Sequence, residues 1–156
     1  MPSDTLHRPV DLNRVVYMST AVGVLRAEEL DRIYFRAKSS NAQASITGLM
    51  LFYEGAFLQV LEGPIAGVSS LLERIRRDRR HANFTVLEAG PAEERLFPDA
   101  PMRFIAARNL SPGEKQAFSD LRQAVSSRPY MLGSPAPGAD NGLGAFLAAF
   151  NPLRAV

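Results

Sequence analysis

The stretch FLQVLEGP, residues Phe57–Pro64, predicts a β-strand that runs directly into a helix. Side chains of a strand alternate between its two faces, so Gln59 points to the same side as Phe57 and Leu61. The residues between them are also apolar, which is typical of an interior strand covered on both faces. Gln59 is the exception, because a buried amide without partners costs about 1–3 kcal/mol. Its partner is either another group of the core or a bound ligand that presents both a carbonyl and a ring nitrogen.

The composition indicates one domain with a full hydrophobic core, since 46% of the 156 residues are hydrophobic. The 18 Lys and Arg residues barely exceed the 16 Asp and Glu residues, which does not favour nucleic acid as a partner. The chain has neither an apolar run of about 20 residues nor the charged-then-apolar start of a signal peptide. We therefore expect a cytoplasmic protein that does not enter a membrane.

Missing residue types limit the chemistry. The chain has no Cys, which excludes disulfides, thiolate nucleophiles and thiolate metal ligands. It has no Trp either, so redox chemistry of an aromatic side chain depends on its 4 tyrosines. His7 and His81 are far apart, and neither is at metal-ligand spacing from another ligand, so we expect no metal site. No Ser-His-Asp arrangement and no glycine-rich phosphate loop is found, and we expect no enzymatic activity.

Periodicity and turn signals predict alternating strands and helices. Glu54-Gly55 predicts a two-residue hairpin, Pro64 suits the first turn of a helix, and Ser111-x-x-Glu114 has the spacing of a capping box. The expected strands cover residues 14–19, 46–53, 57–63, 84–89 and 102–107, and the expected helices cover residues 26–41, 64–80 and 111–127.

This order predicts an α+β fold of the ferredoxin-like βαββαβ type, with an added fifth strand, two helices on one face of the sheet, and a C-terminal helical extension. We expect right-handed crossovers to place the first and third strands side by side and parallel in the sheet centre. Tyr17 and Gln59 would then lie on neighbouring strands, beneath the two helices if their faces match.

The chain divides into a flexible arm (1–13), a main domain (14–107) and the C-terminal helical extension (108–156). The extension contains a Pro- and Gly-rich linker at 128–144 and a short helical stretch at 145–150. We expect it to pack on the open face of the sheet or against another subunit.

Two groups of side chains are candidates for a site. Tyr17, Asn41 and Gln59 each have an ordinary structural explanation, but together with apolar neighbours they could bind a flat heteroaromatic ring. The basic run from Arg74 to His81 is typical of a solvated helix end, and the alternative is a site for a phosphate-bearing ligand tail.

Over about residues 14–107 the sequence resembles a BLUF domain, the flavin-binding blue-light sensor. Five motifs in the family's order carry this resemblance. They are VVYMS (15–19), Asn41 followed by ITG (46–48), FLQVLEG (57–63), RDRRH (77–81), and RLF (95–97) leading to Met102.

The resemblance implies roles for individual residues. Tyr17 would be the photochemical electron donor, and Gln59 would be the amide between the Tyr17 hydroxyl and the flavin N5 and C4 carbonyl. Asn41 would hold the pyrimidine edge of the ring, and Ile33 would pack against the ring. Met102 would lie on the fifth strand, beside the first and close to Gln59. Further cofactor contacts, several of them towards the ribityl chain and phosphates, would be Ser40, Arg74, Asp78, Arg80 and His81.

The implied cofactor is FAD, with FMN or riboflavin as alternatives. Light would drive electron and proton transfer from Tyr17 through Gln59, leaving the amide rearranged and the flavin absorption shifted to the red. The signal would pass through the sheet to the helix at 111–127 and alter the interaction with a downstream protein, in a chain that we expect to form homo-oligomers. Many family members carry Trp at the position of Ala100, which puts the Trp/Met step of signalling in question here.

Two other functions are compatible with the residues. One is a light-independent flavin-binding redox or regulatory module, and the other is a ligand-free ferredoxin-like interaction protein. A reversible red shift on illumination separates the photoreceptor from the first, and a colourless folded protein would favour the second.

Overall fold

Strand β3 (Ala56–Pro64) lies at the centre of the sheet, and each of its residues before Pro64 is buried. The structure is a computed structural model and describes residues 11–99, 101–127 and 146. Around β3, the other elements are β1 (Leu12–Ala21), α1 (Ala27–Gln43), β2 (Thr47–Tyr53), α2 (Ile65–Arg77), β4 (His81–Pro91), β5 (Arg103–Ala106), a 3₁₀ turn η2 (Ala107–Asn109) and α3 (Pro112–Ser127).

The five strands form one sheet in the order β4-β1-β3-β2-β5. β1 and β3 are neighbours, as expected, but they run antiparallel, with Leu12 opposite Pro64 and Thr20 opposite Ala56. The expectation of a parallel pair is wrong, because the crossover through α1 makes β1 parallel to β2 and the hairpin then reverses the chain before β3. The ferredoxin-like arrangement itself is confirmed.

The two-residue hairpin between β2 and β3 is also confirmed. Glu54 and Gly55 both have positive φ, 49° and 77°, as a turn of type I′ requires. Farther along the same pair of strands, a Cβ atom added to Gly48 would overlap the carbonyl oxygen of Val60. The close contact of β2 with β3 therefore depends on glycine at position 48.

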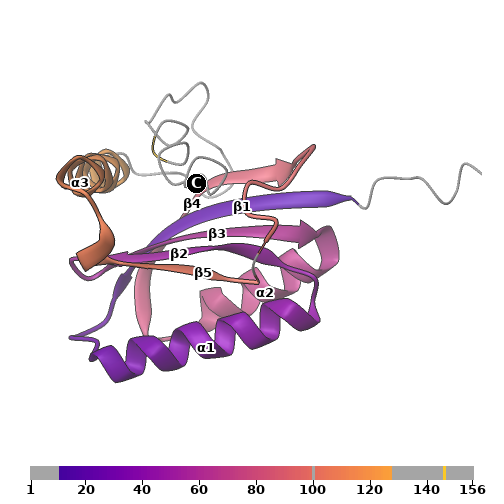
Figure 1. Ribbon diagram of the computed structural model, residues 1–156, viewed down its shortest axis with the longest axis horizontal. Coiled ribbons are helices and arrows are strands. Elements are labelled where there is room, and N and C mark those ends of the chain that lie inside the picture. Colours follow the sequence, from indigo (N-terminus) through magenta and orange to yellow (C-terminus); the bar gives the residue numbers. More distant parts are fainter. Residues whose placement is uncertain (1–10, 100, 128–145, 147–156) are drawn as a thin grey trace, which may run out of the picture.

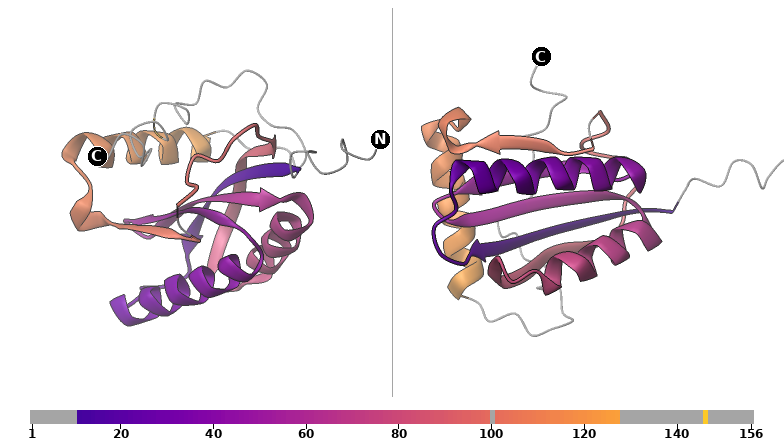
Figure 2. Two further views of the ribbon diagram at one scale, coloured as in Figure 1. Left: turned by 45° about the vertical axis from the view of Figure 1, so that its right-hand side comes forward. Right: turned by 90° about the horizontal axis from the view of Figure 1, so that it is seen from below.

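Helices α1 and α2 lie on the same face of the sheet, as Figures 1 and 2 show. Acidic Glu28 and Glu29 occupy the first turn of α1, where the helix dipole favours negative charge. Pro64 is the N-cap of α2 and therefore precedes the first turn in which it was expected. α2 ends at Arg77, three residues earlier than expected, because Asp78 adopts an extended conformation that leads into β4.

The sheet separates two hydrophobic clusters. The cluster beneath α1 and α2, called here the helix-side cluster, consists of Val15, Tyr17, Ile46, Met50, Phe57, Leu61, Val68, Leu71 and Met102. The cluster on the other face, called the α3-side cluster, consists of Val16, Met18, Leu49, Leu51, Ala56, Leu58, Val60, Phe97, Leu110, Phe118, Leu121 and Phe146.

Helix α3 covers the face of the sheet that α1 and α2 leave open (Figure 1), which is the first of the two positions expected for it. Its capping box is formed: the Glu114 backbone N–H donates to Ser111 Oγ at 3.1 Å, and the Ser111 backbone N–H donates to Glu114 Oε1 at 3.0 Å. Of the helical stretch expected at 145–150, the structure describes Phe146, which is helical and lies against Phe118. The linker at 128–144 lies outside the described residues.

The two strands that flank the site are longer than expected. β1 begins at Leu12, inside the expected arm, and residues 1–10 lie outside the described part of the chain.

The pairing of β4 with β1 is irregular at two places, between Val16 and Tyr17 and between Met18 and Thr20. At the second irregularity Asn83 has φ +54°. Such bulges re-aim side chains, and this one precedes Phe84, which packs against the helix-side cluster.

Within the ranges that the structure describes, no helix combines the length and the apolar character needed to cross a membrane.

Candidate functional site

Tyr17 and Gln59 form the centre of the site. They are direct cross-strand partners in the β1–β3 ladder, and both are 4% exposed. The Tyr17 hydroxyl donates a hydrogen bond to Gln59 Oε1. The faces of the two residues match, which was the condition set for a shared site: Tyr17 belongs to the helix-side cluster, and both side chains line one cavity beneath α1 and α2.

The amide nitrogen of Gln59 is less well satisfied than its carbonyl. Nε2 lies 3.9 Å from Met102 Sδ, and a thioether sulfur is a weak acceptor. The core of the protein thus supplies a strong partner for one end of the amide and a weak one for the other. This leaves donor capacity at Nε2 for a ligand.

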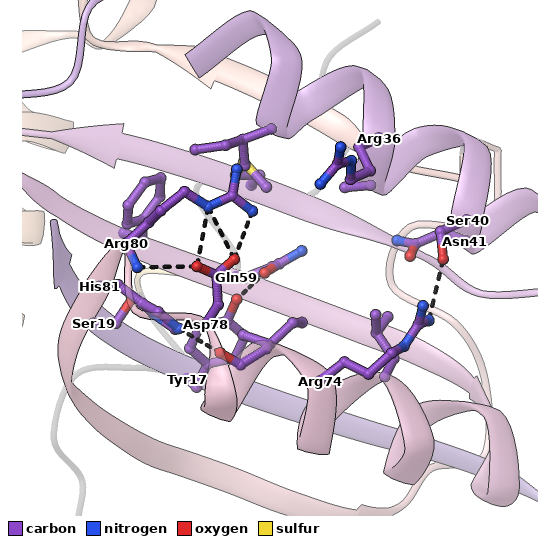
Figure 3. Close-up of a pocket in the computed structure, with 16 residues that line it drawn as sticks. Tyr17, Ser19, Arg36, Ser40, Asn41, Gln59, Arg74, Asp78, Arg80 and His81 are labelled. Atoms are coloured by element: carbon purple, nitrogen blue, oxygen red, sulfur yellow. Dashed lines mark hydrogen bonds and ion pairs between the residues drawn. The ribbon is translucent and has the colours of Figure 1, made fainter. Parts of the chain in front are cut away.

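A cavity of about 240 Å³ opens beside this pair, between α1 and α2 and above β1 and β3 (Figure 3). All the predicted site residues except Met102 line it. Its lining consists of Tyr17, Ser19, Ile33, Arg36, Ala37, Ser40, Asn41, Met50, Phe57, Gln59, Leu71, Arg74, Ile75, Asp78, Arg80 and His81.

Met102 contacts Gln59, as expected, but not from a strand next to β1. It directly precedes β5, and β5 pairs with β2 at the sheet edge, separated from β1 by β2 and β3. The expected position beside the first strand is wrong, because β3 and β4 occupy both edges of β1 and β5 pairs with β2 instead. Ala100, the position at which many members of the family that the sequence resembles carry Trp, lies outside the described residues.

Two buried polar atoms in the cavity wall have no hydrogen-bond partner among the described residues: Ser19 Oγ and Asn41 Oδ1. Ser19 is 3% exposed and Asn41 is 1% exposed. The other end of the Asn41 amide is paired, since Nδ2 donates to the Pro101 carbonyl at 3.0 Å. Each unpaired buried atom costs about 1–3 kcal/mol. Both atoms would gain partners from a polar ligand in the cavity.

An ion pair sits at one end of the cavity, near Tyr17 (Figure 3). Asp78 accepts hydrogen bonds from the backbone N–H and the guanidinium of Arg80. The Arg80 side-chain hydrogen bond lowers the pKa of Asp78, and the same bond raises the pKa of Arg80. Asp78 therefore carries a negative charge close to the site.

The pKa of Tyr17 is raised above its ordinary value, first by burial and then by the negative charge of Asp78. Both causes disfavour the phenolate. The hydroxyl consequently stays protonated and remains a hydrogen-bond donor at all physiological pH values.

The ring of Tyr17 also contacts two aromatic neighbours from β4. Phe84 stacks on it with ring centroids 4.6 Å apart, and His81 lies at 6.5 Å. The guanidinium of Arg76 lies 5.4 Å from the centroid of the Phe84 ring. Phe84 was not among the predicted site residues, because the bulge at Asn83 that aims it cannot be read from periodicity.

The opposite end of the cavity is basic. Figure 3 shows Arg36 of α1 and Arg74 of α2 on the two sides of this end, with Ser40 and Asn41 between them. Arg74 Nη2 donates to Ser40 Oγ at 3.2 Å, and both arginines are exposed. Sequence reasoning missed Arg36 and Ser19. Helix spacing from Ile33 and Ser40 would have indicated Arg36, and strand alternation from Tyr17 would have indicated Ser19.

The described part of the chain contains no group of three or more His, Cys, Asp or Glu side chains that could hold a metal ion.

Comparison with known proteins gives a family match over most of this domain. The model of the family described as "BLUF: Sensors of blue-light using FAD" matches residues 12–103. Photoactivated adenylate cyclase subunit beta of Euglena gracilis is 38% identical over 97 residues, which are 62% of this chain and 11% of that protein. The chain thus matches about a tenth of the length of this curated relative.

Solved structures agree with this match. A bacterial light-regulated adenylyl cyclase superposes with a TM-score of 0.66 and 32% identity, over 74% of this chain and 34% of that one. The dark-state structure of BlrB, a BLUF protein, superposes with a TM-score of 0.67, over 90% of this chain and 97% of that one. Its sequence identity is 24%, so this second likeness shows the fold.

Proposed function

Because this chain belongs to the BLUF family of flavin-dependent blue-light sensors, we propose that it is a photoreceptor in which Tyr17 and Gln59 respond to light absorbed by a bound flavin. The observation that carries the proposal is the hydrogen bond from the Tyr17 hydroxyl to Gln59 Oε1 at the wall of the cavity. It joins an oxidisable phenol to an amide that can exchange its donor and acceptor ends.

The cavity fits a flavin ring in its chemistry. Its walls are apolar where Ile33, Phe57 and Leu71 contribute, and they suit a flat aromatic ring. The unpaired Ser19 Oγ and Asn41 Oδ1 suit a ring with polar edges. Asn41, Gln59 and Ser19 would hold the ring edges, while Ile33 would pack against its face.

A bound flavin would absorb blue light and supply the excited state that oxidises a neighbouring phenol. Tyr17 would lose an electron, and its hydroxyl proton has a direct acceptor in Gln59 Oε1. Since Nε2 of Gln59 contacts only the weak acceptor sulfur of Met102 among the described residues, the amide has little to hold it in one orientation. After the electron and proton return to Tyr17, a rotated or tautomeric Gln59 would keep the altered hydrogen-bond pattern.

The proposal includes a phosphorylated flavin, with FAD preferred. Arg36 and Arg74 present exposed guanidinium groups at one end of the cavity, and guanidinium groups pair with phosphate oxygens in a bidentate manner. Asp78, Arg80 and His81, which the family resemblance assigns to the ribityl side, line the opposite end of the cavity beside Tyr17 (Figure 3) and would contact the cofactor there. FMN shares one phosphate with FAD, whereas riboflavin has none.

Titration of the flavin-free protein with FAD, FMN and riboflavin tests the choice of cofactor. Arg36→Ala and Arg74→Ala should weaken the binding of FAD and FMN and leave riboflavin binding unchanged. Arg32→Ala is the matched control for Arg36→Ala, since Arg32 is also exposed on α1 but does not line the cavity. Equal losses for all three flavins would refute a phosphate contact.

The step that follows light absorption, namely what the protein acts on, is also proposed. We infer that the chain has no catalytic activity of its own and acts in the cytoplasm, as a homo-oligomer, on a separate downstream protein. Two of the proteins named above, the Euglena gracilis cyclase subunit and the bacterial adenylyl cyclase, are light-regulated cyclases with much longer chains, which supports coupling to an effector. Light scattering in the dark and under blue light tests self-association and its dependence on light.

The test of the proposed function is the visible absorption spectrum of the flavin-loaded protein before and after blue light. A reversible red shift of the flavin bands is the expected result. A bound flavin whose spectrum does not change would favour the light-independent module instead.

A further inference from the structure

Glu62 is a buried carboxylate that the proposed photochemistry does not use. It lies three residues after Gln59 in β3 and is 0% exposed. Because its position differs by an odd number from that of Gln59, its side chain points to the other face of the strand. It shares that face with Leu58 and Val60 of the α3-side cluster. Glu62 therefore does not line the cavity.

Among the residues that the structure describes, the hydrogen-bond partners of Glu62 are N–H donors, and both carboxylate oxygens accept. Arg14 Nε lies 2.9 Å from Oε2, and the backbone N–H groups of Leu96 and Phe97 donate to the carboxylate at 2.9 Å. A buried carboxylate is unfavourable unless such bonds satisfy it. Because losing these hydrogen bonds would leave a buried carboxylate without partners, they fix the backbone at residues 96 and 97 against β3.

Arginine side chains fasten the same stretch. Arg95 donates to Thr47 Oγ1 at 2.8 Å, to the Glu62 carbonyl at 3.1 Å and to the Ser45 carbonyl at 2.9 Å. Arg14 Nη2 donates to the Glu94 carbonyl at 2.8 Å. Residues 94–97, called here the anchored segment, are thus tied to the start of β1, the start of β2 and the end of β3.

The chain that follows the anchored segment leads to the site. The Pro101 carbonyl accepts from Asn41 Nδ2 at 3.0 Å, the Met102 carbonyl accepts from the Tyr34 hydroxyl at 3.3 Å, and Met102 Sδ faces the Gln59 amide. Phe97 belongs to the α3-side cluster and Met102 to the helix-side cluster. Phe97 and Met102, which flank this part of the β4–β5 connection, therefore lie on opposite faces of the sheet.

We propose that Glu62 is a positioning residue that sets Met102 against Gln59. Four residues separate Phe97 from Met102, so a fixed Phe97 limits where Met102 can lie. When the Gln59 amide rearranges, its neighbour Met102 therefore belongs to a stretch whose other end, the anchored segment, is fixed. Phe97 of that segment lies on the face that α3 covers. This inference rests on the proposed function for its role in the light response, but the position of Met102 can be measured without light.

The experiment uses the full chain loaded with FAD, labelled with ¹³C at the methionine methyl groups and recorded by NMR in the dark. Glu62→Gln replaces one acceptor oxygen with an NH₂ group facing backbone donors, and it should shift and broaden the Met102 methyl signal. Met18 of the α3-side cluster and Met50 of the cavity wall are internal controls and should keep their signals. Glu88→Gln, at an exposed position of β4, should change none of the three.

An unchanged Met102 signal in Glu62→Gln overturns the proposal, and so does a common shift of Met18, Met50 and Met102, which would indicate a general loss of structure. If Glu62→Gln does not fold, Arg95→Gln removes the side-chain bonds of the same segment from a partly exposed position and must give the same selective change at Met102. If Glu62→Gln changes the Met102 signal selectively but the wild-type protein shows no red shift in blue light, the positioning role of Glu62 stands and the proposed function is contradicted.

A second measurement links the position to the light response. Glu62→Gln and Met102→Ala should each change the dark-recovery rate by about fivefold, and the double variant should change it by no more than the larger single effect. Multiplying effects would show that Glu62 does not act through Met102, while a normal red shift in all of them would leave the proposed function intact.

Discussion

Gln59 lies directly opposite Tyr17 in the ladder between β1 and β3, and its Oε1 accepts the hydrogen bond of the Tyr17 hydroxyl. The two side chains are 42 residues apart in the sequence, and α1, β2 and a hairpin connect their strands. Burial on the sheet gives the Tyr17 hydroxyl one defined acceptor, Gln59 Oε1. The proposed electron loss from the Tyr17 phenol and the proposed rearrangement of the Gln59 amide therefore both act on this one hydrogen bond.

Tyr17→Phe should leave the flavin bound and abolish the red shift, because the ring loses its oxidisable hydroxyl. Flavin fluorescence should rise several-fold, since the nearest electron donor is gone. The variant should also unfold about 1–3 kcal/mol more easily when flavin-free, because Gln59 Oε1 loses its partner. Tyr34→Phe is the control: it removes a hydroxyl that donates to the Met102 carbonyl at 3.3 Å, and it should keep the low fluorescence. Strong quenching in Tyr17→Phe would assign the donor elsewhere.

Ser19→Ala should have opposite effects on the free and the loaded protein. The flavin-free form should gain about 1 kcal/mol of unfolding free energy, because the substitution removes a buried hydroxyl without a partner in the described structure. Flavin affinity should fall by about fivefold or more, since the ligand loses a hydrogen bond. Chemical denaturation and flavin titration measure the two changes. A gain in affinity would mean that Ser19 does not contact the ligand.

The red shift should keep its amplitude from about pH 6 to pH 9. The raised pKa of Tyr17 keeps the phenol protonated above its ordinary value of about 10. Its contribution to stability is therefore present below pH 10 and is lost as the pH rises further. The lowered pKa of Asp78 has the opposite sign: its contribution is present above about pH 4 and is lost as the pH falls. Difference spectra across this range check the prediction, and a midpoint near pH 7 would be incompatible with it.

Gly48→Ala should destabilise the fold by about 3 kcal/mol or more, because the new methyl group would overlap the Val60 carbonyl oxygen and push β2 away from β3. Gly113→Ala is the matched control in the first turn of α3, where a Cβ meets nothing closer than Ser111 Oγ at 3.9 Å. Thermal or chemical unfolding of both variants measures the difference. Equal stabilities would show that the two strands can separate locally without cost.

Much of the site follows from two-residue alternation. The pattern around Gln59 and around Tyr17 predicts which side chains share a face, and turn chemistry at Glu54-Gly55 predicts the hairpin. Helix spacing places Ile33, Ser40 and Asn41 on the side that faces the sheet. These are local properties, and local properties can be read from the order of residues.

Other parts of the site depend on contacts between distant segments. Glu62 binds Arg14 and the backbone of Leu96 and Phe97, at separations of 34 to 48 residues, and no periodic pattern indicates these partners. The bulge that aims Phe84 at Tyr17 depends on the left-handed conformation of Asn83. The direction of β3 was predicted wrongly from the order of elements, and the place of β5 beside the first strand was predicted wrongly from the family resemblance. Both depend on how the whole chain crosses the sheet.

The central claim is that the Gln59 amide converts light absorption into a changed hydrogen-bond pattern. Its most direct test is the visible spectrum of the flavin-loaded Gln59→Leu variant before and after blue light, beside the wild-type protein. The wild-type flavin bands should shift reversibly to the red, and those of Gln59→Leu should stay in place while the flavin remains bound. A full red shift in Gln59→Leu would contradict the account.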